Sequence, residues 1–189
     1  MSRRRRIDAF VLVGLCLLLG AGASVAAAVG DTERIADYWA SATVVEGEAQ
    51  VVEVIDYDFG VNSRRGILRD ADDLEPQADV AVSSPTAPDQ FTATAIPGGT
   101  QLRIGDPDVT ITGRHRYTIE YPLSTLVQGD TVSWNAIGTA WDVGTSDFEL
   151  HLLVDRELTG IECSKGQRGA IGGCTAEQVE AGHLVVDGG

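Results

Sequence analysis

The sequence has 189 residues, a net charge of −14 at pH 7 and 43% hydrophobic residues. The hydrophobic content is too high for a disordered chain, and the length suits one folded domain with its own core. A domain this acidic repels phosphate backbones, so we exclude nucleic acid as a partner.

Residues 1–30 have the pattern of a signal peptide or a membrane anchor. Arginines occupy positions 3–6, and no charged residue occurs over residues 9–30. The alanines at positions 26–28 fit the A-x-A rule for signal cleavage. The uncharged stretch is also long enough to span a membrane as a helix, so both fates remain open. In either case residues 31–189 are expected on the extracytoplasmic side.

Alternating apolar residues first appear over 38–45 and 51–59, on either side of Glu46-Gly47. The pattern predicts a β-hairpin. One face of its second strand would carry alternate residues, namely Val51, Glu53, Ile55, Tyr57 and Phe59.

Short strands are predicted along the rest of the chain. They cover residues 80–82, 91–95, 102–104, 117–123, 132–136, 148–154 and 183–186. Pro122 cannot donate to a ladder, so the strand over 117–123 should lie at an edge or end there. Helical turns are expected only near 31–40, 70–74 and 176–181. Many short strands separated by turns predict an all-β fold, an antiparallel β-sandwich of Ig-like character over residues 31–189.

Two cysteines follow the N-terminal segment, Cys163 and Cys174. In an exported protein such a pair favours a disulfide. Closing this short, glycine-rich loop would add about 3 kcal/mol in the chain-entropy model. A zinc site is the weaker alternative, because further ligands are lacking nearby.

Three arginines stand out in a predicted loop of about 16 residues between strands. They are Arg64, Arg65 and Arg69, with Asp70 beside them. One hypothesis is structural: the arginines pair with Asp58, Asp70 or Asp72, so that Arg69→Ala should lower the melting temperature. The other is a partner-docking loop formed by Arg64, Arg65, Arg69 and Asp70.

The sequence offers no catalytic motif and no cofactor site. The three histidines, His115, His151 and His183, are scattered without metal-ligand spacing. A G-x-S-x-G elbow and a phosphate-binding glycine loop are both absent. We therefore predict a protein that is not an enzyme. A weaker alternative is a hydrolase whose site is assembled from residues far apart in sequence.

Two features keep a ligand-binding alternative open. Acidic residues at 70, 72, 73 and 75 could supply oxygen ligands to calcium, although turn capping and solvation are the favoured explanation. Trp134 and Trp141 could form a surface pair for cell-wall glycan, with core packing as the ordinary explanation.

Three motifs in a fixed order resemble the predicted membrane proteins of domain-of-unknown-function family 2207. They are YDFG with RGILRD at 57–70, IGDPD with TGRHRYTIEY at 104–121, and WNAIG with WDV at 134–143. The chain departs from the family pattern at Ala71-Asp72-Asp73, where an apolar residue and proline are usual. It departs again at Gly144-Thr145, where proline and an aliphatic residue are common.

The resemblance implies a signal peptide, an extracytoplasmic β domain, then transmembrane helices and a low-complexity tail. No second apolar segment precedes Gly189. We therefore expect a fragment lacking those helices, a truncated product or a variant without a C-terminal anchor. The family supplies no catalytic residue. The leading hypothesis is a non-catalytic envelope module that binds a membrane or envelope protein or acts as a spacer, with calcium or glycan binding as the alternative.

Overall fold

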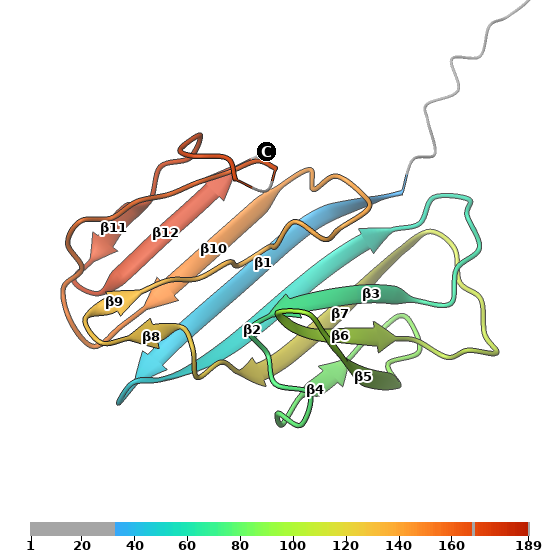
Figure 1. Cartoon of the computed structure of the whole chain (residues 1–189). Coiled ribbons are helices and arrows are strands. Elements are labelled where there is room, and N and C mark those ends of the chain that lie inside the picture. Colours follow the sequence, from blue (N-terminus) through green and yellow to red (C-terminus); the bar gives the residue numbers. More distant parts are fainter. Residues whose placement is uncertain (1–32, 168, 189) are drawn as a thin grey trace, which may run out of the picture.

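The computed structural model describes residues 33–167 and 169–188, and these residues form an all-β fold (Figure 1). The sandwich-like β architecture predicted from the alternation is thereby confirmed. The predicted signal or anchor helix over residues 1–30 lies outside the described residues, and the proposed domain boundary at residue 31 stays a prediction. Within the described ranges, no helix is long and apolar enough to cross a membrane.

A seven-stranded sheet forms the main layer, in the order β11-β12-β10-β1-β2-β7-β4 (Figure 1). Its strands are β1 (Arg34–Val45), β2 (Glu48–Asp58), β4 (Ala81–Ser83), β7 (Arg114–Pro122), β10 (Phe148–Leu153), β11 (Glu177–Glu180) and β12 (His183–Gly188). The predicted hairpin is β1–β2, and its turn residues Glu46 and Gly47 both have positive φ. Pairing is antiparallel as expected except between β1 and β10, which run parallel.

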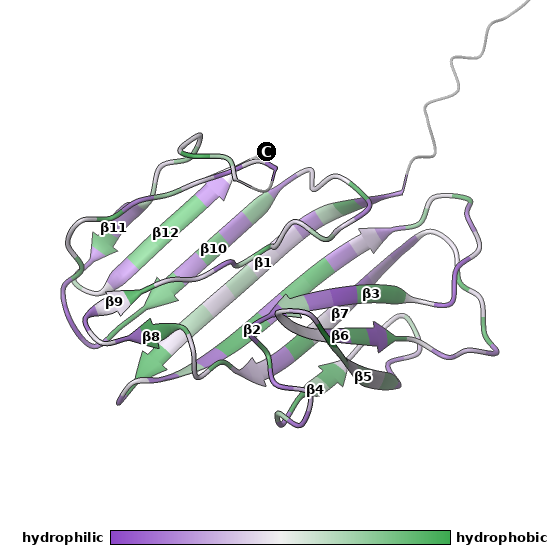
Figure 2. Cartoon of the chain, in the orientation of Figure 1, coloured by the Kyte–Doolittle hydropathy of each residue, from purple (hydrophilic) through white to green (hydrophobic). Residues whose placement is uncertain are grey.

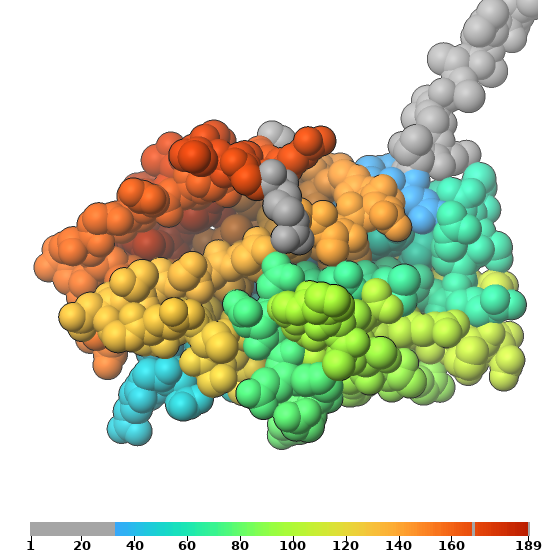
Figure 3. Space-filling view, in the orientation of Figure 1, coloured from blue at the N-terminus to red at the C-terminus, as the bar shows by residue number. Residues whose placement is uncertain are grey.

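A smaller layer covers one face of the large sheet. It contains the three-stranded sheet of β3 (Ile67–Asp72), β6 (Gly99–Ile104) and β5 (Phe91–Ile96), in the order β3-β6-β5. The hairpin of β8 (Val127–Gln128) and β9 (Thr131–Val132) adds to it. Figure 3 shows this layer and the yellow-to-orange segment after β7 packed over the near face of the large sheet. The two layers of the sandwich are therefore unequal in size.

The core lies between these layers. Alternate residues of β1, β2 and β7 point into it, and Tyr38, Val51, Ile55, Tyr117 and Ile119 are fully buried. Figure 2 shows the resulting alternation of hydrophobic and hydrophilic bands along the strands of the large sheet. The face predicted for the second hairpin strand is confirmed, because its five members from Val51 to Phe59 are all buried.

Close backbone contact fixes where β3 and β6 begin to pair. Gly66 and Gly105 have φ of 114° and 131°. A Cβ on Gly66 would lie 1.8 Å from the carbonyl oxygen of Ile104, and one on Gly105 would lie 2.0 Å from that of Arg65. Only glycine tolerates both the backbone conformation and the approach.

The segment after Asp58 corrects the predicted long loop. Residues 67–72 form strand β3, because Ile67, Arg69 and Ala71 alternate into the core while Leu68, Asp70 and Asp72 face outward. The helical turns predicted near 31–40 and 176–181 are also strands, β1 and β11.

The strand predicted over 132–136 ends at Val132. Beyond it the chain crosses the sheet irregularly, because the carbonyl of Ala136 accepts hydrogen bonds from Tyr38 and Arg69 instead of joining a ladder. Strand β7 lies inside the sheet between β2 and β4, and it ends at Pro122 as predicted.

Candidate functional site

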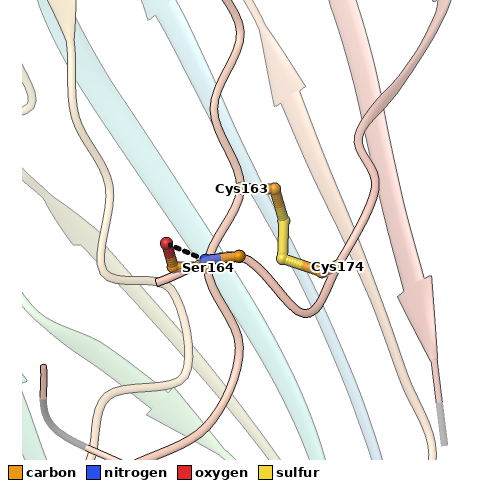
Figure 4. The surroundings of a disulfide bond; sticks show 4 residues. Cys163, Ser164 and Cys174 are labelled. Atoms are coloured by element: carbon orange, nitrogen blue, oxygen red, sulfur yellow. Dashed lines mark hydrogen bonds between the residues drawn. A yellow bond between two sulfur atoms is a disulfide. The ribbon is translucent and has the colours of Figure 1, made fainter. Parts of the chain in front are cut away.

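The predicted disulfide is present. Cys163 and Cys174 are bonded with their Cα atoms 5.5 Å apart (Figure 4). Ser164 accepts a hydrogen bond from the backbone N–H of Gly172 beside it, at 3.1 Å. This clip holds the loop that leads from β10 back to β11 and β12.

The predicted docking residues do not form one surface. Arg64 pairs with Glu33 at 2.7 Å, and both Arg64 and Arg65 are exposed. Arg69 is only 2% exposed, so the prediction that it belongs to an accessible loop is wrong. Its partner is Glu53 rather than the predicted acidic neighbours, because the side chain points inward from β3. Asp70 points the other way and accepts a hydrogen bond from Gln101 at 2.8 Å.

Arg69 and Glu53 form the centre of a buried polar cluster between the two layers. The guanidinium donates from Nε and Nη2 to the two carboxylate oxygens, at 2.9 and 2.7 Å. Tyr121 donates its hydroxyl proton to Glu53 at 2.6 Å. The Ala136 carbonyl accepts from both Tyr38 and Arg69 at 3.0 Å. The carbonyl of Asp70 accepts from the same guanidinium.

The buried cluster is charged but closed to solvent. Burial alone would lower the pKa of Arg69, yet the Glu53 carboxylate holds it above its ordinary value, so the guanidinium stays protonated. Burial also raises the pKa values of Tyr38 and Tyr121, which therefore remain hydroxyl donors. Trp141 closes the cluster, with its ring centroid 5.8 Å from the guanidinium carbon. Because its charges are paired and its members are buried, the cluster joins the two layers.

The opposite face of the large sheet is solvated. In Figure 1 the smaller layer lies in front of the sheet, so the sheet's own side chains form the face turned away. We call this the open face. It carries outward residues of β1, β2, β7, β10 and β12, namely Asp37, Trp39, Val54, Asp56, Arg116, Glu149, His151, His183 and Asp187.

Two shallow depressions mark the open face. The first is lined by Asp37, Trp39, Val54, Asp56 and Arg116, with Trp39 half-buried. The second, at the start of β10, combines Phe148 and Gly188 with carboxylates. These carboxylates come from three segments and are Asp37, Asp147, Glu149 and Asp187. Phe148 faces the core side here, and Lys165 Nζ lies 5.0 Å from its ring centroid. The aromatic ring of the open face that lies beside the carboxylates is Trp39, which is the register partner of Glu149.

Asp56 is the acidic residue of this face with the most cationic partners. Arg116 binds it through Nε and Nη2 at 2.6 and 2.7 Å, and Arg114 binds it at 2.7 Å. The hydrogen bond from Arg116 is the largest cause of a lowered Asp56 pKa, and Arg114 adds to it. Both arginine side chains remain about half exposed.

Histidines far apart in sequence meet on the open face. His151 Nδ1 lies 3.0 Å from His183 Nε2, and its Nε2 lies 2.7 Å from Glu149 Oε1. Trp39 packs beside His151 with ring centroids 5.5 Å apart. The register of β10 and β12 creates this group, and sequence spacing alone could not reveal it.

The remaining candidate residues are dispersed. Asp72 accepts a hydrogen bond from Asn135, and Trp134 is half-buried against the core. His115 lies between the carbonyls of Thr86 and Thr112. Within the part of the chain that the structure describes, no group of three or more His, Cys, Asp or Glu side chains is arranged to hold a metal ion.

Comparisons with known proteins give one family. A family model described as the N-terminal domain of a predicted membrane protein (DUF2207) matches residues 34–181. A search of curated proteins finds no match.

Among solved structures, native yeast LTA4 hydrolase matches at 9% identity with a TM-score of 0.45. A mutant M1 zinc metallopeptidase from Deinococcus radiodurans matches at 10% with a TM-score of 0.42. Each alignment covers 82% of this chain but only 29% and 38% of those proteins, respectively.

Proposed function

Because the chain belongs to the DUF2207 family of predicted membrane proteins, through their N-terminal domain, we propose that it is a non-catalytic, extracytoplasmic module that binds a basic segment of an envelope protein through the open face. The observation that carries the proposal is the position of Trp39 next to acidic residues: it shares one depression with Asp37, and the strand register places Glu149 and then Asp187 beside it.

Charge complementarity defines the partner. Carboxylates from β1, β10 and β12 line one depression, and the sequence as a whole is acidic. Lysine or arginine side chains would be attracted to this surface and could stack on the half-buried Trp39 ring. Aromatic side chains and arginine pairs commonly supply the strongest contacts of an interface.

The non-catalytic part of the proposal is supported by where the polar groups lie. The groups whose pKa values are raised most, Arg69, Tyr38 and Tyr121, are hydrogen-bonded and buried between the layers. The histidine group is accessible, but its ring nitrogens face each other and Glu149. A nucleophile beside an oriented base is not found among the described residues of this group.

The test is binding of a fluorescent lysine- and arginine-rich peptide to the full chain in detergent, followed by anisotropy. Trp39→Ala should weaken binding about tenfold, the loss expected when an aromatic contact worth about 1.4 kcal/mol is removed. Glu149→Gln combined with Asp187→Asn should weaken it and flatten its salt dependence. Asp108→Asn, in an exposed turn outside the open face, is the matched control. Absence of binding, or equal affinity for all variants, would refute the proposal.

A further inference from the structure

Strand β5 is the outer strand of the smaller sheet. It pairs with β6 on one side, and no described strand pairs with its other side. Its residues Phe91 to Ala95 are exposed, and Phe91 retains 37% of its accessible surface. Phe91, Ala93 and Ala95 lie opposite the buried Ile104, Leu102 and Thr100, so they project from the core side of the sheet without cover.

The hydrogen-bond register shows which backbone groups are free. The N–H of Gly105 donates to the carbonyl of Gln90 at 2.8 Å, which makes this a hydrogen-bonded pair. Such pairs alternate along an antiparallel ladder. Thr92, Thr94 and Ile96 therefore bond to β6, while Phe91, Ala93 and Ala95 direct their N–H and C=O groups to the open edge.

The edges of the large sheet are protected and this one is not. Strand β4 has only three residues and is soon followed by Pro85. Strand β11 carries Glu177 and Glu180 and has an irregular register between Gln178 and Glu180. Short length, charge and bulges are the usual means of preventing strand addition. Strand β5 has six residues, no charge, no proline and an unbroken register.

We propose that β5 pairs antiparallel with β5 of a second copy of this chain, around a two-fold axis at Ala93. In this register Ala93 faces its own copy, Phe91 faces Ala95, and Thr92 faces Thr94. Every outward backbone group of Phe91, Ala93 and Ala95 then has a partner. The cross-strand pairs are also complementary, with a large ring opposite a small methyl group and threonine opposite threonine.

The alternative register, centred on Thr94, is poorer. It would place Phe91 opposite Pro97, which has no N–H to donate. The self-complementary register favours a second copy over an unrelated strand. Because each copy is acidic, their mutual repulsion opposes pairing, so added salt should strengthen the dimer. The dimer contact does not involve the open face. The peptide-binding test and the dimerisation test can therefore succeed or fail independently.

Light scattering and sedimentation of the full chain in detergent test the proposal. We expect a dimer that tightens with salt. Ala93→Pro removes the N–H aimed at the second copy but no bond to β6. It should weaken dimerisation about tenfold, while the melting temperature measured at concentrations where both proteins are monomeric should be unchanged. Ala93→Lys should weaken the dimer at least as much, because it places two like charges opposite each other at the two-fold axis. Ser83→Lys, on the β4 edge, is the matched control and should leave the dimer intact.

Cross-linking tests the register in a Cys16→Ser background, because Cys16 of the N-terminal segment is the one cysteine besides the disulfide-bonded Cys163 and Cys174. Ala93→Cys should form a disulfide-linked dimer under mild oxidation, because the two sulfur atoms would face each other. Thr94→Cys alone should form much less, whereas a mixture of Thr92→Cys and Thr94→Cys chains should cross-link. A monomeric wild-type chain, or a dimer whose dissociation constant is unchanged in both Ala93→Pro and Ala93→Lys, would overturn the proposal.

Discussion

Two carboxylates of β2 show how differently the two faces of the large sheet use the same chemistry. Glu53 points inward, is fully buried and binds Arg69. Asp56, three residues later, points outward and binds Arg114 and Arg116, whose side chains are 52% and 54% exposed. The hydrogen-bond distances are nearly the same, so environment and not geometry distinguishes the two sites.

The difference lies in what remains when one partner is removed. Loss of one member of a buried pair leaves an uncompensated charge away from water, which costs about 3 to 5 kcal/mol. Loss of one member of an exposed pair leaves a charge that water solvates, and such pairs contribute about 0 to 1 kcal/mol. The buried Glu53–Arg69 pair therefore has a large effect on the stability of the two packed layers, whereas the exposed pairs of Asp56 have a small one.

The largest effect is expected for Glu53→Ala. The substitution leaves the buried Arg69 guanidinium without its counter-charge and removes the hydrogen-bond acceptor of Tyr121. The free energy of unfolding should therefore fall by about 3 to 5 kcal/mol. Urea unfolding followed by tryptophan fluorescence measures the change. Glu53→Gln, which keeps the shape and one acceptor, should lose less and serves if the alanine variant does not fold. Wild-type stability in both variants would contradict the role given to the buried cluster.

A smaller effect is expected when both charges are removed together. Glu53→Leu with Arg69→Met and Tyr121→Phe eliminates the buried charges and the hydroxyl that would lose its acceptor. Replacing a whole buried pair by apolar groups is often neutral or stabilising. The triple variant should therefore be more stable than Glu53→Ala alone. If it were less stable, the pair would contribute net stability beyond avoiding a stranded charge.

The smallest effect is expected for Asp56→Asn, at about 1 kcal/mol or less and diminishing with added salt. Because arginine hydrogen bonds lower the Asp56 pKa below its ordinary value of 3.8, its contribution is present above that pH. It is lost as the pH falls through the lowered pKa. The stability difference between wild type and variant should therefore vanish in strong acid. A difference that persists there, or grows with salt, would show that packing and not charge is responsible.

The sequence predicted the positions of the strands better than it predicted which side chains pair with each other. Alternation identified the β1–β2 hairpin and placed Glu53 on its buried face. Arg69 has the same signal, since it alternates with Ile67 and Ala71, but the acidic residues from Asp70 onward made the segment resemble a loop. Charge pairing between strands distant in sequence could not be read from local spacing, and neither could the histidines joined by the β10–β12 register.

The segment around Ala136 shows a second limit. Trp134 and Ala136 alternate like strand residues, yet this stretch makes no ladder beyond Val132. The carbonyl of Ala136 accepts hydrogen bonds from Tyr38 and Arg69 instead. The indole N–H of Trp141 donates to the carbonyl of Ile137 at 3.0 Å. Tertiary hydrogen bonds outweighed local strand preference here.

The parallel contact between β1 and β10 has a consequence for how the chain reaches its fold. One edge of β1 pairs with β2, the next strand along the chain, but its other edge pairs with β10, whose residues come more than a hundred positions later. A chain made from its N-terminus thus carries an unfinished sheet for most of its synthesis, and contacts of such long sequence separation slow folding. A helper that shields the first hairpin during this interval would raise the yield of native protein without changing its final stability.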